Sequence, residues 1–276
     1  MRDGEEGTVL VNVLAIIALC SAVLVTMTSV QTRSIERARL YSDAAQAMEM
    51  ALGGEASVAA ALRRDGREAP EIDHAGEPWA AITDREAIIE GGTFTLSVSD
   101  AQDRFNLTTL RAGGLLATQV AARLSSLLTD DPELARLLTP EAETALRNKD
   151  YATLAALADT LPGAAILFTE LPMATDVNIN SAPEPLLAIL FGNAVMARRI
   201  AALRARRGHV TPADLKALRA LLPVGVGFTS DFYRVRVDVR LGSARRKLDS
   251  LLWRRRGANG QMVVETITRS YGAATE

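Results

Sequence analysis

The chain has 276 residues, 48% of them hydrophobic, and a formal net charge of -2. These values are typical of an ordinary folded protein and exclude an intrinsically disordered chain. The length allows one sizeable domain, or two small ones, in addition to a membrane segment. Cys20 is the only cysteine, so an intramolecular disulfide is excluded and an exported body would depend on its hydrophobic core.

Charge is distributed unevenly along the chain. Between Asp65 and Asp103 there are ten acidic residues and two arginines, whereas between Arg198 and Arg256 sixteen basic residues face four aspartates. Two interpretations are open. The two stretches partly neutralise each other or form solvated faces, or each is a docking surface for a charged partner.

The N-terminal segment predicts a membrane span. It contains no Asp, Glu, Lys or Arg between Glu6 and Arg33. As a helix, residues 8–30 are long enough to cross a hydrocarbon core of roughly 30 Å. A secretory signal peptide fits this segment poorly, because its leader is acidic and its apolar run is too long.

Beyond residue 33 the sequence remains helical but becomes amphipathic. Asp65-Gly66 and the following Pro70 mark the end of this pattern. We therefore expect one long helix over residues 8–64, with its membrane-spanning part at about residues 8–30. The apolar positions that recur at spacings of three and four are Ile35, Ala38, Tyr41, Ala45, Met48 and Leu52.

Strand patterns flank the middle of the chain. The stretch GGTFTLSVSD alternates apolar residues with Thr and Ser, and FYRVRVDVRL alternates valines with charged residues. Gly242 and the GANG turn separate two further strand candidates, ARRKLDSLLWRRR and QMVVETITRS. We therefore expect an antiparallel sheet formed by residues 65–105 and 226–276, with a meander at its C-terminal end.

Between these strand regions, residues 106–225 are typical of short helices. One candidate is GGLLATQVAARLSSLL, and three later ones begin at the cap-like sequences Thr139-Pro140, Ser181-Ala182-Pro183 and Thr211-Pro212. The sequence therefore predicts an α+β fold in which a long N-terminal helix packs on a small antiparallel sheet. An all-α domain is inserted between the strands of that sheet.

No catalytic constellation is evident. His74 and His209 are the two histidines, and neither has a companion Cys or Ser placed for nucleophilic chemistry. Asp100 and Asp103 are oxygen ligands of the kind that calcium prefers, but two residues do not make a site. We therefore predict that the chain is not an enzyme, and we assign no cofactor and no metal ligand.

The stretch from Asp176 to Leu218 resembles the helix-hairpin-helix of DNA-binding proteins, in which a turn of the Gly-hydrophobic-Gly type brings backbone N–H groups to a phosphate. The turn here is Gly192-Asn193-Ala194, and its missing second glycine argues against DNA as a partner. Arginines in the second helix nevertheless leave a membrane-tethered DNA-binding protein of the competence type as the alternative hypothesis. They are Arg198, Arg199, Arg204, Arg206 and Arg207.

Several segments together resemble the type IV pilin-like superfamily. A leader that ends in Gly7 is followed directly by an apolar helix with an amphipathic continuation. Most members have glutamate five residues after this glycine, where this chain has Asn12, and the K-type minor pseudopilins of type II secretion typically lack that glutamate. SVSDAQDRFNLTTL, DVNINSAPEPLLAIL and FYRVRVDVRLGSARRKLDSLLWRR are similar, in this order, to segments of the K-type subfamily.

The resemblance implies a processing pathway. Residues 1–7 would be a leader that a prepilin peptidase removes by cutting between Gly7 and Thr8, and Thr8 would become the methylated N-terminus. Asn12 would then be the fifth mature residue, the subunit-packing position. The leader of this chain is acidic, whereas such leaders are usually basic.

The same resemblance implies a role without catalysis. The chain would be a single-pass protein of the bacterial inner membrane with its body in the periplasm, and it would cap the tip of the pseudopilus. Its implied partners are I-type and J-type minor pseudopilins and the major pseudopilin, while contact with secreted cargo is left open. The inserted domain lacks the acidic, aromatic-rich segment expected there, so no metal site is transferred.

Overall fold

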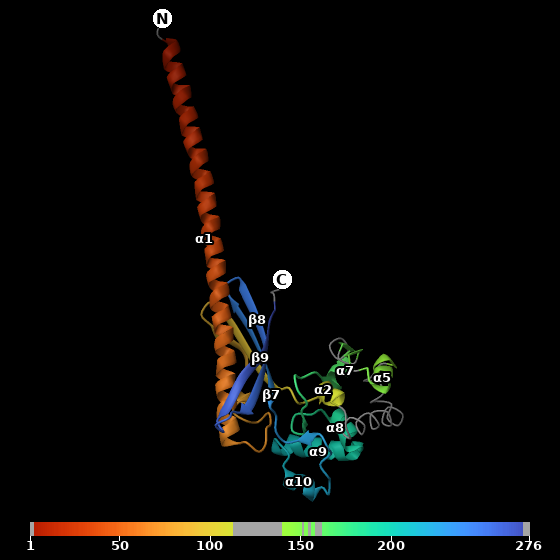
Figure 1. Ribbon diagram of the computed structural model, residues 1–276. Helices are drawn as coiled ribbons and strands as arrows, with labels where there is room; N and C mark the ends of the chain where they lie inside the picture. Colours follow the sequence, from red (N-terminus) through yellow and green to blue (C-terminus); the bar gives the residue numbers. More distant parts are fainter. Residues whose placement is uncertain (1–2, 113–139, 151, 154–155, 158–161, 273–276) are drawn as a thin grey trace.

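The computed structural model describes residues 3–112, 140–150, 152–153, 156–157 and 162–272. Its largest element is helix α1, Asp3–Glu68, whose 66 residues correspond to a length of about 100 Å. The N-terminal part of α1 extends away from the rest of the protein, and its C-terminal part packs along a β-sheet (Figure 1). The helix begins within the acidic leader and continues four residues beyond the expected end at residue 64.

Five antiparallel strands form the main sheet, in the spatial order β1-β2-β7-β8-β9. The expected C-terminal meander is confirmed, because β7, β8 and β9 pair consecutively. Strand β1 was not expected from the sequence and forms one edge of the sheet. The strands are β1 (Asp84–Ile89), β2 (Gly92–Asp100), β7 (Phe232–Leu241), β8 (Ala244–Arg256) and β9 (Met262–Gly272).

The alternation of β7 explains how the sheet packs. Its residues Tyr233, Val235 and Val237 are buried against α1, whose buried positions include Ala51 and Val58. The intervening charged residues lie on the opposite face, because successive side chains of a strand point to opposite sides. Two ion pairs link neighbouring strands on that face, and they join Arg236 to Asp249 and Arg245 to Asp238.

The segment between β2 and β7 forms a second unit with its own hydrophobic core (Figure 1). Besides helices, it contains two short parallel pairs, β3 with β4 and β5 with β6, which the sequence did not predict. Its helices are α2 (Leu107–Arg111), α5 (Pro140–Arg147), α7 (Pro162–Leu167), α8 (Glu184–Phe191), α9 (Ala194–Arg207) and α10 (Pro212–Ala217). The short strands are β3 (Phe105–Asn106), β4 (Phe168–Thr169), β5 (Val177–Asn178) and β6 (Val226–Gly227).

The predicted helix starts of α8 and α10 are confirmed. Helix α8 begins directly after Pro183, and α5 is described from Pro140 onward. Helix α10 begins with a capping box, in which Thr211 and Asp214 satisfy each other's backbone N–H groups. The further helix expected at GGLLATQVAARLSSLL lies outside the described residues.

Candidate functional site

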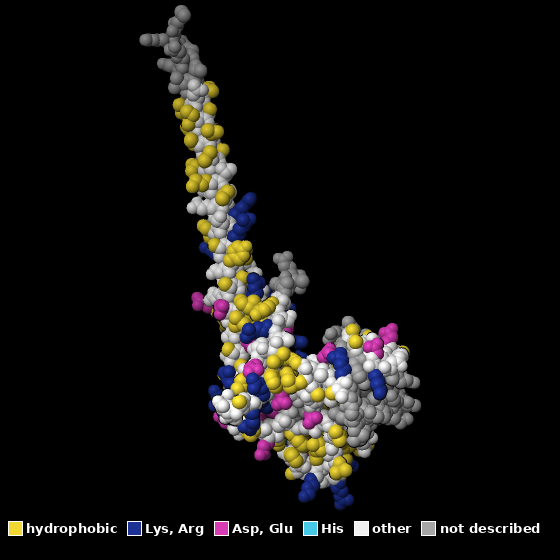
Figure 2. Space-filling view, viewed as in Figure 1, with side chains coloured by type: hydrophobic (Ala, Val, Ile, Leu, Met, Phe, Trp, Pro, Cys, Tyr) yellow, Lys and Arg dark blue, Asp and Glu magenta, His cyan; other side chains and the backbone are white. Residues whose placement is uncertain are grey.

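The N-terminal part of α1 is the one described helix that is long and apolar enough to cross a membrane. Its side chains from Leu10 to Val30 are exposed, on a helix that projects away from the rest of the described chain (Figure 2). Gly7 and Thr8 lie within α1, and Asn12 follows one turn later with an exposed side chain. The only strongly polar residue near the start of this apolar surface is thus at the predicted packing position.

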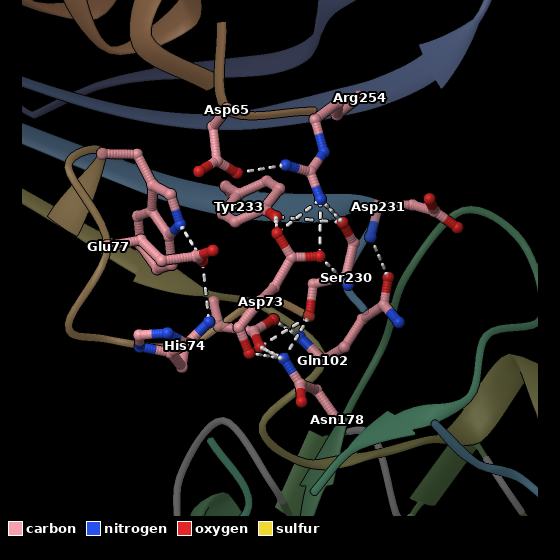
Figure 3. Close-up of polar contacts among 12 residues, drawn as sticks. Asp65, Asp73, His74, Glu77, Gln102, Asn178, Ser230, Asp231, Tyr233 and Arg254 are labelled. Carbon is pink, nitrogen blue, oxygen red and sulfur yellow. Dashed lines mark hydrogen bonds and ion pairs between the residues drawn. The ribbon is translucent and has the colours of Figure 1, made fainter. Parts of the chain in front are cut away.

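Where the C-terminal end of α1 meets the sheet, a buried arginine joins two aspartates (Figure 3). Arg254 of β8 donates from Nη1 to Asp65 Oδ2 at 2.7 Å, and from Nη2 to Asp73 Oδ1 at 2.6 Å and to the Ser230 carbonyl at 2.9 Å. Its guanidinium also lies 5.1 Å from the centre of the Tyr233 ring. Because buried charges are stable only when they are paired, this network joins α1, the following loop and the sheet.

Glu77 adds a third buried carboxylate to this network. It accepts hydrogen bonds from the His74 backbone N–H and from Trp79 Nε1, both at 2.8 Å. Burial raises the pKa of Asp65 to about 7, and the negative charge of Glu77 adds to this effect while Arg254 opposes it. Oxygen atoms of Asp65, Asp73 and Glu77 lie within 4.8 Å of one another, as in a metal site. Arg254 already supplies a positive charge there, so we assign the cluster a structural role.

A second set of polar contacts joins the inserted unit to the sheet. Asn178 donates from its side-chain amide to Asp100 Oδ2 at 2.8 Å, to the Asp73 carbonyl at 3.0 Å and to Ser230 Oγ at 3.0 Å. Burial raises the pKa of Asp100 to about 6, although hydrogen bonds from Ser181 and Ser230 lower it. These bonds fix the inserted unit against the end of β2.

The structure places Asp100 and Asp103 in different environments. Asp100 is buried within the hydrogen bonds just described, whereas Asp103 pairs with Arg104 at 3.0 Å and lies 3.9 Å from Arg234. Their carboxylates therefore already have partners in the protein, and we assign no calcium ligand to either.

The two histidines, which appeared unrelated in the sequence, stack against each other. The ring centres of His74 and His209 lie 4.3 Å apart, and the ring planes differ by 9°. His74 Nδ1 accepts a hydrogen bond from the Gly76 N–H at 3.0 Å, and burial lowers the pKa of His74. His74 also lines a pocket of about 420 Å³ with Ser181, whose hydroxyl donates to Asp100 and not to an imidazole base. This arrangement is not that of an activated nucleophile.

The helix-hairpin-helix resemblance is confirmed only in outline. Helix α8 ends at Gly192, which has a φ of +61°, and Asn193 caps α9 by accepting from the Met196 N–H at 3.0 Å. Two arginines of α9 form hydrogen bonds or ion pairs with other residues of the protein. Arg204 donates to the Ile179 and Ala182 carbonyls, and Arg207 pairs with Asp214 at 2.6 Å.

These contacts support the first of the two interpretations of the charge distribution, partial neutralisation, for some of the residues. Four of the ten acidic residues between Asp65 and Asp103 are buried, and two of them pair with Arg254 of the basic stretch. Partial neutralisation therefore explains part of the asymmetry. The sequence held a signal for this pairing in the opposite charges of the two stretches, but it did not identify which residues meet.

No family model matches the sequence. The chain is 28% identical to type II secretion system protein K of Pseudomonas aeruginosa, in an alignment that covers 96% of this chain and 92% of that protein. It is 25% identical to the protein of the same name from Pectobacterium carotovorum over 99% of this chain and 98% of that protein. A Klebsiella pneumoniae protein K is 32% identical, over 41% of this chain and 35% of that protein.

The fold is also similar to a solved structure. A chain of the GspK-GspI-GspJ complex from the type 2 secretion system of enterotoxigenic Escherichia coli superposes with a TM-score of 0.56 at 18% identity. The match covers 88% of this chain and 100% of that chain. It confirms the α+β fold with a long N-terminal apolar helix, an antiparallel sheet and further helices. The near full-length sequence matches make the chain similar to protein K of type II secretion systems, and together with this shared fold they support a GspK-like minor pseudopilin.

Proposed function

We propose that this chain is a minor pseudopilin of a type II secretion system. In this proposal it is processed between Gly7 and Thr8, methylated at Thr8, and placed at the tip of the pseudopilus with its body in the periplasm. In this proposal residues 1–7 are the leader and residues 106–225 are a domain inserted into the pilin-like sheet. The exposed apolar part of α1 supports a single-pass anchor, because it has the length and composition of a membrane span.

Asn12 is the observation that carries the proposal of a tip position. If Thr8 is the first mature residue, Asn12 is the fifth, where related subunits have a glutamate that pairs with the N-terminal ammonium of a neighbour. An asparagine side chain is neutral, so it cannot form that ion pair in an apolar environment. A subunit of this kind would be poorly suited to a place beneath another subunit and suited to the end of a filament.

The position of the inserted unit is consistent with a tip subunit. It lies at the end of the molecule opposite the N-terminus of α1 (Figure 1). A bulky unit at this end leaves little room for another subunit stacked above it. The similar Escherichia coli chain comes from a complex with GspI and GspJ, which supports I-type and J-type subunits as partners. The prepilin peptidase, the major pseudopilin and secreted cargo are further partners in this proposal.

Mass spectrometry of the N-terminus tests the processing directly. The full chain, produced with a prepilin peptidase of a type II secretion system, should begin at N-methylated Thr8, and a Gly7→Val variant should retain residues 1–7. Comparable processing of both chains, or a different first residue, would contradict the assignment of Gly7 and Thr8.

The contacts of two α9 arginines weaken the DNA-binding alternative. Arg204 donates to two backbone carbonyls and Arg207 pairs with Asp214, so two of the five cations considered are already engaged. Titration of the full chain with duplex DNA at two salt concentrations would test the alternative, since phosphate binding weakens as salt rises.

A further inference from the structure

Directly after α10, the chain forms an apolar groove of about 380 Å³. Leu215 is buried, and Phe228 packs against the core of the inserted unit beside the groove. Leu221 and Leu222 also line the groove and come from the segment that leads from α10 to β6. The groove therefore combines a floor that belongs to the folded core with a wall that belongs to a surface segment.

The surface segment that carries this wall exposes large apolar side chains. Leu221 is 90% exposed, and Val224 and Leu222 are 57% and 42% exposed. Single exposed apolar residues are common, but three within four residues beside an apolar groove are typical of an interaction surface. Figure 2 shows hydrophobic side chains gathered at this end of the molecule, with Lys and Arg side chains beside them.

The backbone holds this segment in an unusual conformation. Arg219, directly after the last turn of α10, has a φ of +54°, which non-glycine residues rarely adopt. Its N–H bonds to the Lys216 carbonyl at 3.0 Å, and the Ala220 N–H bonds to the Leu215 carbonyl at 2.9 Å. These bonds end the helix and direct the following leucines along the surface.

The rim of the groove is positively charged. Lys216 and Arg219 both line it, and neither makes an ion pair with another residue of the described ranges. The nearest acidic residue in the sequence, Asp214, is already engaged by Thr211 and by Arg207. An occupant that supplies carboxylates would therefore meet two cations without competition from a neighbouring acid.

The location excludes two other occupants on physical grounds. α10 lies at the end of the molecule opposite the N-terminal part of α1, so the groove beside it is far from the membrane that the apolar helix would span (Figure 1). A second copy of this chain that docked through the same surface would bring Lys216 and Arg219 against their own counterparts, which is unfavourable.

We propose that this groove binds an acidic segment of a partner protein, which inserts a large apolar side chain between Leu215 and Leu221 and places carboxylates against Lys216 and Arg219. The inference rests on the proposed function, because a surface at the membrane-distal end of a tip subunit is available to exported proteins. Beyond the proposed function, it names the binding site and the chemical character of the segment that the site recognises.

Two fluorescent peptides test this recognition with the full chain in nanodiscs of zwitterionic lipid. Both carry a central Leu-Phe pair, flanked in one by three glutamates on each side and in the other by three lysines on each side. We expect the acidic peptide to bind about tenfold more tightly than the basic one, and its affinity to fall as salt is raised. Equal binding of the two peptides, or binding of neither, would overturn the proposal.

Charge reversal separates the groove from general electrostatic attraction. The variant Lys216→Glu/Arg219→Glu should reverse the preference between the peptides, whereas Arg198→Glu/Arg199→Glu, on the exposed surface of α9, should leave it unchanged. Leu221→Ser should weaken binding of the acidic peptide, but the variant should still bind the acidic peptide more tightly than the basic one. If both double variants act alike, the groove is not the site.

Processing at Thr8 and assembly with the partner pseudopilins are measured independently, so their failure would be distinguishable from failure of this inference.

Discussion

Arg254 and Asp65 lie 189 residues apart in the sequence and form a buried ion pair, with Arg254 Nη1 2.7 Å from Asp65 Oδ2. The side chains are only 6% and 4% exposed, so water contributes little to the solvation of either charge. The pair joins the end of α1 to β8, and Asp73 extends it to the loop that leads to the rest of the sheet. The attachment of the long helix to the body therefore depends on electrostatic contacts as well as on apolar packing.

Replacing Arg254 by Met should destabilise the body strongly. The variant leaves Asp65 and Asp73 buried without their cation, and removal of one partner of a buried ion pair typically costs about 3 to 5 kcal/mol. Denaturant unfolding of the full chain in detergent would measure the loss. Arg256→Met, at an exposed position on the same strand, is the matched control and should change the free energy of unfolding by less than about 0.5 kcal/mol. Similar losses in the two variants would contradict the role of the network.

The raised pKa of Asp65 predicts a specific pH dependence. Because its pKa is about 7 in the folded protein and 3.8 is the ordinary value, the folded state binds more protons than the unfolded state between these pH values. The contribution of this residue to stability therefore decreases as pH rises from about 4 to 7 and is constant above that range. Asp65→Asn should remove this contribution, so the difference in melting temperature between variant and wild type should change across the range. A difference that is independent of pH would contradict the raised pKa.

Glu55 should hold β9 against α1. This buried glutamate accepts hydrogen bonds from Arg269 Nη2 and from Thr266 Oγ1, both at 2.7 Å. Burial raises its pKa, but bonds from Arg269, Ser250 and Thr266 outweigh burial and lower the pKa overall. Glu55→Ala should cost about 1.5 to 3 kcal/mol, the range for hydrogen bonds to charged groups. It should also increase hydrogen exchange in β9 more than in β7, and Glu49→Ala, at an exposed position on the same helix, should change neither.

Asn12→Glu tests the proposed tip position. If the missing carboxylate keeps the subunit at the end of the filament, restoring it should allow the subunit to occupy internal positions as well. Site-specific crosslinking in assembled filaments should then detect neighbours on both sides of the variant, and on one side of the wild type. Asn12→Gln keeps the side chain neutral and should behave as the wild type does. Neighbours on both sides of the wild type would contradict the tip position.

The local patterns of the sequence were sufficient for most secondary structure. The long helix, the strands β2 and β7 to β9, and the starts of α8 and α10 were all expected from periodicity, turn residues and helix caps. Strand β1 was missed. It contains a register shift, and its Glu86 has a φ of +69°, so its alternation is interrupted within six residues.

The sequence by itself determined which segments are apolar, which alternate and where helices begin, because these properties depend on neighbouring residues. It also placed Asn12 at the start of the apolar helix. Only the tertiary structure decided that Arg254 meets Asp65 and Asp73, that His74 stacks on His209, and that Lys216 borders an apolar groove. Such contacts join residues far apart in the chain or depend on the path of a loop. They follow from how the helix, sheet and inserted unit pack together, which no local pattern specifies.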